Sequence, residues 1–262
     1  MQTSEEKVKV YCKSYGVIKS NLFTNSNECL ENSDIIIYQI HLPDYFGNIK
    51  DLSSFLETNE LNRAKRYYKE SDKNKFIICR ALLKLILSFY TKLHVRNIKI
   101  DYNINKKPYL SSQPSLHFNV SHSGDYAIIA VANRIVGIDI EYINDNYNFW
   151  YAVRNTFDKD EISFIENSTY KSRAFYELWT RKEAFVKALG KGIDDDFLRV
   201  PCIDGLHIID SLLTDTEDNW KIQSYQITKN YIFSLAFTSK KNAAEKLILY
   251  SLPHSLKDLT II

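Results

Sequence analysis

The sequence predicts an α+β fold made of two similar halves, each a small, mostly antiparallel sheet packed with helices. Three observations predict it. The order strand, helix, long helix and then further strands occurs twice, on either side of a boundary near Asn133. Helices and strands are segregated within each half, which favours an α+β class. The chain has 262 residues, enough for one large domain or two small ones. We expect halves at 34–133 and 134–262, preceded by an N-terminal extension, 1–33, to which we assign no role.

The first half begins with its firmest strand, DIIIYQIH at 34–41. The segment 73–90 is apolar nearly all round, which is typical of a buried helix. The other elements expected in this half are a helix at 59–70 and strands at 98–105, 116–120 and 126–132.

The second half repeats this order, although residue identity between the halves is too low to prove a duplication. A strong β run at 134–143 opens it, and a long helix follows at 171–189, with Gly190 at its end. The other elements expected here are a helix at 159–166 and strands around 206–209, 220–227 and 231–237.

Composition excludes several classes of protein. Hydrophobic residues make up 45% and charged residues 25%, as in ordinary globular chains, and the net charge of +2 gives little support to a nucleic-acid partner. The longest apolar run, 76–90, contains Arg80 and Lys84 and is shorter than the roughly 20 residues of a membrane span. The N-terminus lacks a signal-peptide core, so we expect a cytoplasmic protein without a membrane partner. No two of the four cysteines have CxxC spacing, so the cysteines suggest neither a zinc site nor a redox pair.

Acidic and basic side chains form the first candidate site. Asp139 and Glu141 lie two apart in a strand and so share one face, either as a solvated face or as ligands of a hard metal such as Mg²⁺. On the helix 171–189, Glu183 and Lys187 are spaced as a helix salt bridge, or as further members of that site. Lys182 falls near the middle of the apolar stripe of the helix. It is either a snorkelling stem or a buried cation aimed at a phosphate.

Two polar turns form the second candidate site. In SHSGD, 121–125, the serines either satisfy backbone groups of the turn or join His122 in binding a phosphate. The turn KKP, 106–108, is either a solvated loop or a phosphate contact. A cluster of lysines and arginines between 63 and 80 is mostly surface, with a few members available to a phosphate.

Taken in order, these motifs resemble those of the 4′-phosphopantetheinyl transferase superfamily, in its larger, surfactin-synthetase-activating type. The motifs are FNVSHSGD, GIDIE and LWTRKEAFVKALGKG, with RAKRYYKESDKNKFIICRALL upstream. The resemblance covers roughly residues 34 to 240. It implies a pseudo-dimeric monomer that moves the phosphopantetheine arm of coenzyme A to a serine of an apo acyl or peptidyl carrier protein, with adenosine 3′,5′-bisphosphate as by-product.

The resemblance also implies roles for individual residues. Asp139, Glu141 and Glu183 correspond to magnesium ligands. Glu183 is also the implied base for the acceptor serine, directly or through a water, and Lys187 matches the lysine beside the transferred phosphate. The expected contacts to coenzyme A are Ser121 and His122 at its phosphates, Lys107 at the pyrophosphate and nucleotide region, Arg63, Lys75 and Arg80 at the nucleotide and 3′-phosphate, and Lys182 as the buried cation.

Two other functions compete with this one. A carrier-binding module without catalysis would be favoured by loss of one of the three acids or of the lysine, and all four are present. A different Mg²⁺-dependent phosphotransferase would be expected to carry a loop such as GxxxxGK[ST], and the chain has none. Glu60 departs from the family pattern, since a lysine can occur at that position.

Overall fold

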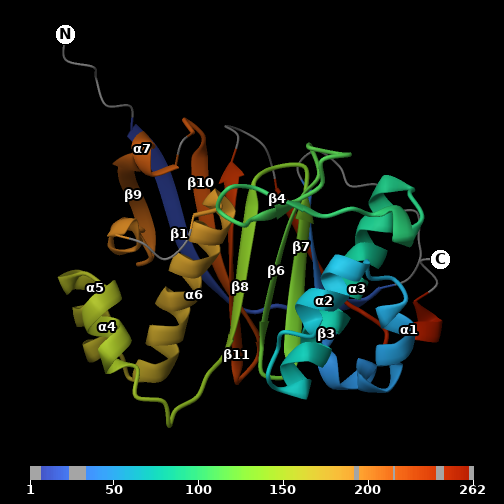
Figure 1. Cartoon of the computed structure of the whole chain (residues 1–262). Helices are drawn as coiled ribbons and strands as arrows, with labels where there is room; N and C mark the ends of the chain where they lie inside the picture. Colours follow the sequence, from blue (N-terminus) through green and yellow to red (C-terminus); the bar gives the residue numbers. More distant parts are fainter. Residues whose placement is uncertain (1–6, 24–33, 192–194, 215, 240–244, 260–262) are drawn as a thin grey trace.

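The computed structural model describes residues 7–23, 34–191, 195–214, 216–239 and 245–259. It consists of two five-stranded sheets with helices at the sides, α1 to α3 beside one sheet and α4 to α6 beside the other (Figure 1). The long helices are α3, Glu70–Thr91, and α6, Lys171–Leu189. The α+β class with two similar halves is thereby confirmed.

The first sheet has the strand order β2-β12-β3-β7-β6. Strand β3 alternates between two apolar environments: Ile36 and Ile40 face the core under α3, whereas Ile35 and Ile37 face a core shared with the second sheet. Burial on both faces explains why the strand has an apolar run, 35–38, in place of alternating apolar and polar residues. The strands are β2, Asn21–Leu22; β12, Lys246–Ser251; β3, Asp34–His41; β7, Tyr126–Ala132; and β6, His117–Ser123.

The second sheet has the order β8-β11-β10-β1-β9. Val10 and Ile222 lie under α6 and pack with Phe185 of that helix, and the opposite face of β8 and β11 packs against the first sheet. The strands are β8, Val136–Tyr142; β11, Tyr231–Ser239; β10, Asn219–Thr228; β1, Lys7–Val17; and β9, Gly205–Asp210.

The two ends of the chain are exchanged between the halves. Strand β1, whose residues we placed in an extension outside both halves, runs parallel to β10 inside the second sheet. Strand β12, whose residues we placed in the second half without expecting a strand there, runs parallel to β3 in the first sheet. The alternation of buried Val8, Val10 and Cys12 with exposed neighbours is what makes 7–17 a strand. The remainder of the predicted extension, 1–6 and 24–33, lies outside the described residues.

The connections differ from expectation in two places. The strand predicted at 98–105 is reduced to β4, Asp101–Tyr102, which pairs with β5, Pro108–Tyr109. The strand is short because the chain turns between these two segments, where Lys106 has φ 65°. The helix predicted at 59–70 ends at Ala64. The remaining elements are η1, Leu42–Asn48; α1, Ile49–Ser53; α2, Thr58–Ala64; η2, Val95–Asn97; α4, Trp150–Thr156; α5, Lys159–Asn167; η3, Asp195–Arg199; α7, Ser211–Thr214; and η4, Leu256–Asp258. Among the helices of the described part of the chain, none has the length and apolar character to cross a membrane.

Candidate active site

The site begins where α6 lies directly against β8. Gly137, Asp139 and Glu141 are spaced two apart on β8, and α6 contacts this strand. A Cβ at Gly137 would overlap the carbonyl oxygen of Ala184 and the backbone nitrogen of Ala188. A glycine is therefore required at 137 for the helix to approach so closely, and this approach brings α6 over the two acids.

A ladder of side chains joins the two sheets at this point. Strand β8 is an edge strand of its sheet and β6 is an edge strand of the other. The N–H groups of Ile138, Ile140 and Tyr142 donate to Asn119 Oδ1 at 2.9 Å, Ser121 Oγ at 3.3 Å and Ser123 Oγ at 3.0 Å. Side chains of β6 thus satisfy the free edge of β8, where a backbone ladder would otherwise be needed. Below, this set is called the seam ladder.

Asp139 is the buried centre of the site, with 3% of its surface exposed. Its Oδ1 accepts from Lys187 Nζ at 2.5 Å and from Ser121 Oγ at 2.8 Å. Its Oδ2 is buried and has no hydrogen-bond partner among the residues that the structure describes. Burial would lower the pKa of Lys187, but the charge of Asp139 and its hydrogen bond outweigh burial and raise it. Lys187 therefore carries a positive charge next to an unused carboxylate oxygen.

Two glutamates complete an acid cluster with Asp139. Burial, followed by the charge of Asp139, raises the pKa of Glu141 to about 7, although the hydrogen bond from Ser123 opposes this rise. The same two causes raise the pKa of Glu183 to about 7. Like charges in a half-buried site repel, so each glutamate binds a proton more readily than in water.

A divalent cation fits the acid cluster. The buried, unpartnered Oδ2 of Asp139 is a ready oxygen ligand, and oxygen ligands are those that Mg²⁺ prefers. The ligand atoms of the three acids do not all lie within 4.8 Å of one another, since only a separate group of described residues meets that distance. Lys187 holds Asp139 and Ser123 holds Glu141, so an ion would have to draw the carboxylates together.

Lys107 and Lys187 line one pocket of about 250 Å³ at the C-terminal end of α6. Lys107 Nζ donates to the carbonyl of Ala188 at 2.5 Å, and its stem lies over Gly190, which has φ 73°. Burial lowers the pKa of Lys107 to about 8. The structure thus brings the lysine of the KKP turn next to the lysine of the acid cluster.

The SHSGD turn is fixed from both halves. Lys75 of α3 donates to the carbonyl of Gly124 at 2.8 Å, and the N–H of Asp125 donates to the hydroxyl of Tyr231 at 3.0 Å. Burial, and then the charges of Lys75 and Lys187, lower the pKa of His122. His122 therefore lies in a positive field from both lysines, as an anion-binding group would.

Arg63 and Arg80 meet at Tyr102. The Tyr102 hydroxyl accepts from Arg63 Nη1 at 3.0 Å and from Arg80 Nη2 at 2.6 Å. Arg63 lines a pocket of about 510 Å³, whereas Arg80 is 8% exposed and pairs with Glu60 at 3.5 Å. Arg63 could therefore contact a ligand in this pocket, whereas Arg80 holds the hydroxyl of Tyr102 in place. This pocket, here called the basic pocket, is lined by Asn59, Arg63, Arg66, Tyr67, Tyr102 and Lys106.

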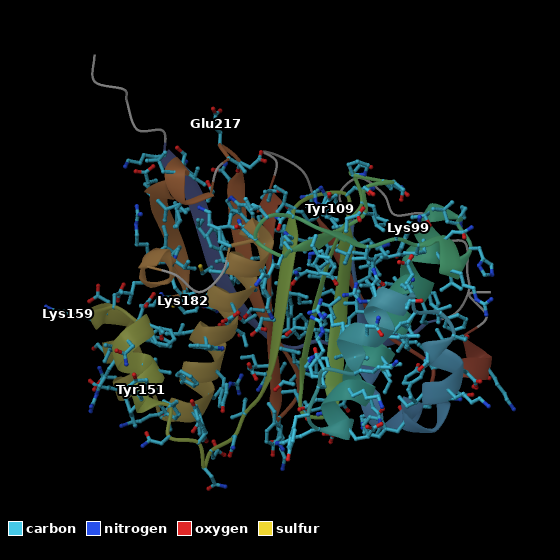
Figure 2. The ribbon with its side chains drawn as sticks, viewed as in Figure 1. Lys99, Tyr109, Tyr151, Lys159, Lys182 and Glu217 are labelled. Atoms are coloured by element: carbon cyan, nitrogen blue, oxygen red, sulfur yellow. The ribbon has the colours of Figure 1, made fainter. Side chains whose placement is uncertain are left out.

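Lys182 lies away from these groups, which corrects its expected role at a phosphate. It is fully buried, pairs with Glu161 Oε2 of α5 at 2.9 Å, and donates to the carbonyls of Phe197 at 3.2 Å and Val200 at 2.9 Å. Figure 2 labels it in the second half, between α6 and α5. Its ammonium donors are used inside the protein, so Lys182 is a structural residue.

The first half contains the same arrangement. Glu60 and Glu161 each complete a capping box at the N-terminus of a short helix, α2 or α5. Each then pairs with a buried lysine of the following long helix, Lys84 at 3.2 Å or Lys182 at 2.9 Å. The equivalence explains both Lys182 and the acidic residue at position 60, and it supports the similarity of the halves at the level of side chains.

A second groove, of about 390 Å³, opens beside Glu141. Here it is called the aromatic groove, because half of its lining residues are aromatic. The lining comprises Ser123, Gly124, Glu141, Tyr142, Asn144, Tyr147, Ala152, Phe175, Tyr176 and Trp179.

Sequence reasoning missed several residues of the site. The role of Asn119 could have been suspected from the polar residues at every second position of FNVSHS. Of the basic-pocket residues, Arg66 belongs to the basic cluster between 63 and 80 and Lys106 to the KKP turn, so both lie in segments that the sequence marks as available to a phosphate. Tyr67 and Tyr102 carry no such pattern, because they come from segments that only the fold brings together.

Comparison with known proteins finds two matching family models. Residues 47–134 match the one described as "4′-phosphopantetheinyl transferase, N-terminal", and residues 135–236 match "4′-phosphopantetheinyl transferase superfamily". Curated relatives include the 4′-phosphopantetheinyl transferases HetI of a Nostoc species, psf-1 of Bacillus pumilus and Sfp of Bacillus subtilis. HetI is 31% identical over 64% of this chain and 73% of its own length. The corresponding values are 30%, 80% and 91% for psf-1, and 29%, 68% and 80% for Sfp.

Proposed function

Because this chain belongs to the 4′-phosphopantetheinyl transferase superfamily, in its Sfp-like type, we propose that it moves the 4′-phosphopantetheine arm of coenzyme A to a serine of an apo carrier protein. Adenosine 3′,5′-bisphosphate is the by-product. One observation carries the proposal: the acid cluster and Lys187 meet at the seam of the two sheets, where Asp139 keeps an unpartnered oxygen.

The acid cluster would hold Mg²⁺ through Asp139, Glu141 and Glu183. When bound there, the ion supplies positive charge that offsets the negative oxygens of a pyrophosphate. Lys187 and Lys107, which line the same pocket, would bind oxygens of that pyrophosphate. His122 would donate a further hydrogen bond to it, and Ser121 would do so by turning its hydroxyl away from Asp139. These groups surround the phosphorus with positive charge, which the attack of a hydroxyl requires.

Glu183 would accept the proton of the attacking serine, directly or through a water. Its pKa of about 7 belongs to the metal-free site, and the charge of a bound ion would lower it, so the carboxylate would be ionised as a proton acceptor must be. Lys187, one turn along α6, keeps its own proton because the charge and hydrogen bond of Asp139 raise its pKa. Glu183 would therefore accept a proton, and Lys187 would bind the transferred phosphate.

The positions of two pockets support one orientation for bound coenzyme A. The basic pocket would take the nucleotide and its 3′-phosphate through Arg63 and Arg66. The aromatic groove would take the pantetheine arm and the approaching carrier serine beside Glu141. Lys75 comes from the first half and the acid cluster from the second, so a monomer would contain a complete site.

The test is intact-mass analysis of several apo carrier proteins incubated with this protein, coenzyme A and Mg²⁺. The expected result is the mass gain of one phosphopantetheine arm. Binding of carriers without any mass gain would favour a non-catalytic carrier-binding module and overturn the proposal.

Glu183→Gln tests the role of the base. The change keeps shape and polarity but removes one metal ligand and the proton acceptor. Turnover should fall by about 10²–10⁴, the usual cost of losing a general base, while the melting temperature is retained. Near-normal turnover at saturating Mg²⁺ would show that another group takes the proton, and Lys187 could do so only after losing the proton that it carries.

A further inference from the structure

Two histidines and an aspartate meet on the surface of the first half, and none of them belongs to the acid cluster. His41 is the last residue of β3, Asp44 lies in η1, and His254 follows β12. His41 Nδ1 is 2.8 Å from Asp44 Oδ1, and His254 Nδ1 is 2.5 Å from Asp44 Oδ2. Among the described residues, this is the one group of three such side chains whose ligand atoms all lie within 4.8 Å of one another.

The backbone around the three ligands is fixed. Leu252 donates its N–H to the carbonyl of Gln39 at 2.9 Å, and the hydroxyl of Tyr45 donates to the carbonyl of Pro253 at 2.5 Å. The ring of His41 packs on Tyr126 with centroids 5.2 Å apart. The backbone that carries the three ligands is therefore held in place before any ion arrives, while the side chain of His254, 82% exposed, leaves a path to solvent.

We propose that His41, Asp44 and His254 bind a divalent transition-metal ion of the Zn²⁺ class, at a site separate from the Mg²⁺ site of the acid cluster. Two imidazole nitrogens and one carboxylate oxygen are donors that suit Zn²⁺, Ni²⁺ or Cu²⁺, whereas Mg²⁺ prefers oxygen alone. Three protein ligands leave a fourth tetrahedral position for water.

The existing separations suit such an ion. With metal–ligand bonds of roughly 2.0–2.1 Å, tetrahedral ligand atoms lie about 3.4 Å apart. The two nitrogen–oxygen separations, 2.8 and 2.5 Å, are shorter than this, and no two of the three ligand atoms are more than 4.8 Å apart, so side-chain rotations would bring them to the ion. In the metal-free protein the Nδ1 protons of the imidazoles bond to the carboxylate. On binding, a neutral imidazole moves its proton to Nε2 and gives its Nδ1 lone pair to the metal.

The ion would connect parts of the chain that are far apart in sequence. His254 and Asp44 are separated by 210 positions. A metal bound to both joins the segment after β12 to the first half, and by mass action it stabilises the folded state alone.

The test is a Zn²⁺ titration of the full chain by calorimetry, in saturating Mg²⁺ so that the acid cluster is occupied. A parallel NMR titration follows the imidazole nitrogens. The variant is His254→Ala, whose exposed side chain makes misfolding a minor concern, and the matched control is His94→Ala, an exposed histidine elsewhere. We expect the binding of one Zn²⁺ to shift the NMR signals of the Nδ1 atoms of His41 and His254.

His254→Ala should lower the Zn²⁺ affinity by about 10–100-fold or more. Loss of a residue that only hydrogen-bonds to a metal ligand already lowers metal affinity by that factor, and His254 would be a ligand itself. The control should bind like the unaltered protein. Equal Zn²⁺ affinity in His254→Ala and in the unaltered protein would overturn the proposal. So would shifts confined to other histidines.

Discussion

Asn119→Ala tests whether the seam ladder holds the two sheets together. Asn119 Oδ1 accepts the N–H of Ile138 at 2.9 Å, and both residues are buried, at 5% and 0% exposure. Without the amide, a buried N–H loses its partner, which costs about 1–3 kcal/mol of the free energy of unfolding. At about 2–4 °C per kcal/mol for a chain of this size, the melting temperature should fall by about 2–12 °C.

The assay pairs thermal unfolding with hydrogen exchange of single amides. The amide of Ile138 should lose protection, whereas that of Ile140, which donates to Ser121, should keep more of its own. Asn62→Ala on the exposed surface of α2 is the matched control, with an expected change within about 0.5 kcal/mol. If Asn119→Ala melts like this control and Ile138 stays protected, the ladder does not carry the contact between the sheets.

Three further predictions concern titratable and charged residues inside and outside the site. The two glutamates of the acid cluster have a pKa of about 7 when folded, against 4.5 as the ordinary value, so ionising them costs stability as pH rises through that window. Mg²⁺ must displace their protons below pH 7, so its affinity should rise from pH 6 to pH 8, by at most about tenfold per pH unit for each proton displaced. Calorimetric titrations at the two pH values check this, and a pH-independent affinity would contradict it. Lys182→Met should lower the free energy of unfolding by about 3–5 kcal/mol, because it leaves Glu161 buried without its cation. Denaturant titration measures this change, and Lys159→Met at an exposed position is the control that should cost little. Equal costs for the two variants would refute the structural role of Lys182. His122→Ala should weaken coenzyme A binding in calorimetry, and unchanged affinity would remove His122 from the site.

The sequence predicts most of this fold because its long elements have strong patterns. The helix at 171–189 was expected with the bounds that α6 has, and the apolar strands 34–41 and 126–132 match β3 and β7. The exchange of β1 and β12 between the sheets could not be predicted. A strand pattern states which side chains are buried, but it does not state which sheet buries them.

The same limit explains Lys182. Its position in the apolar stripe of the helix indicates a buried cation, and the residue is buried. The partner of that cation, Glu161, comes from another helix, so helical spacing alone could not distinguish a carboxylate from a phosphate. The placing of Gly137 beneath α6 is likewise a property of packing between elements.

The two sheets share an apolar core, and this core restricts how the two halves can move. A hinge that separated the halves would expose this core, to which β3 and β7 of one sheet and β8 and β11 of the other contribute. It would also break the hydrogen bonds of the seam ladder between β6 and β8. We therefore expect the halves to move as one body, so that the substrates of the proposed reaction would enter pockets that are already formed. Adaptation to different carriers would fall to surface side chains and loops rather than to rotation of one half against the other.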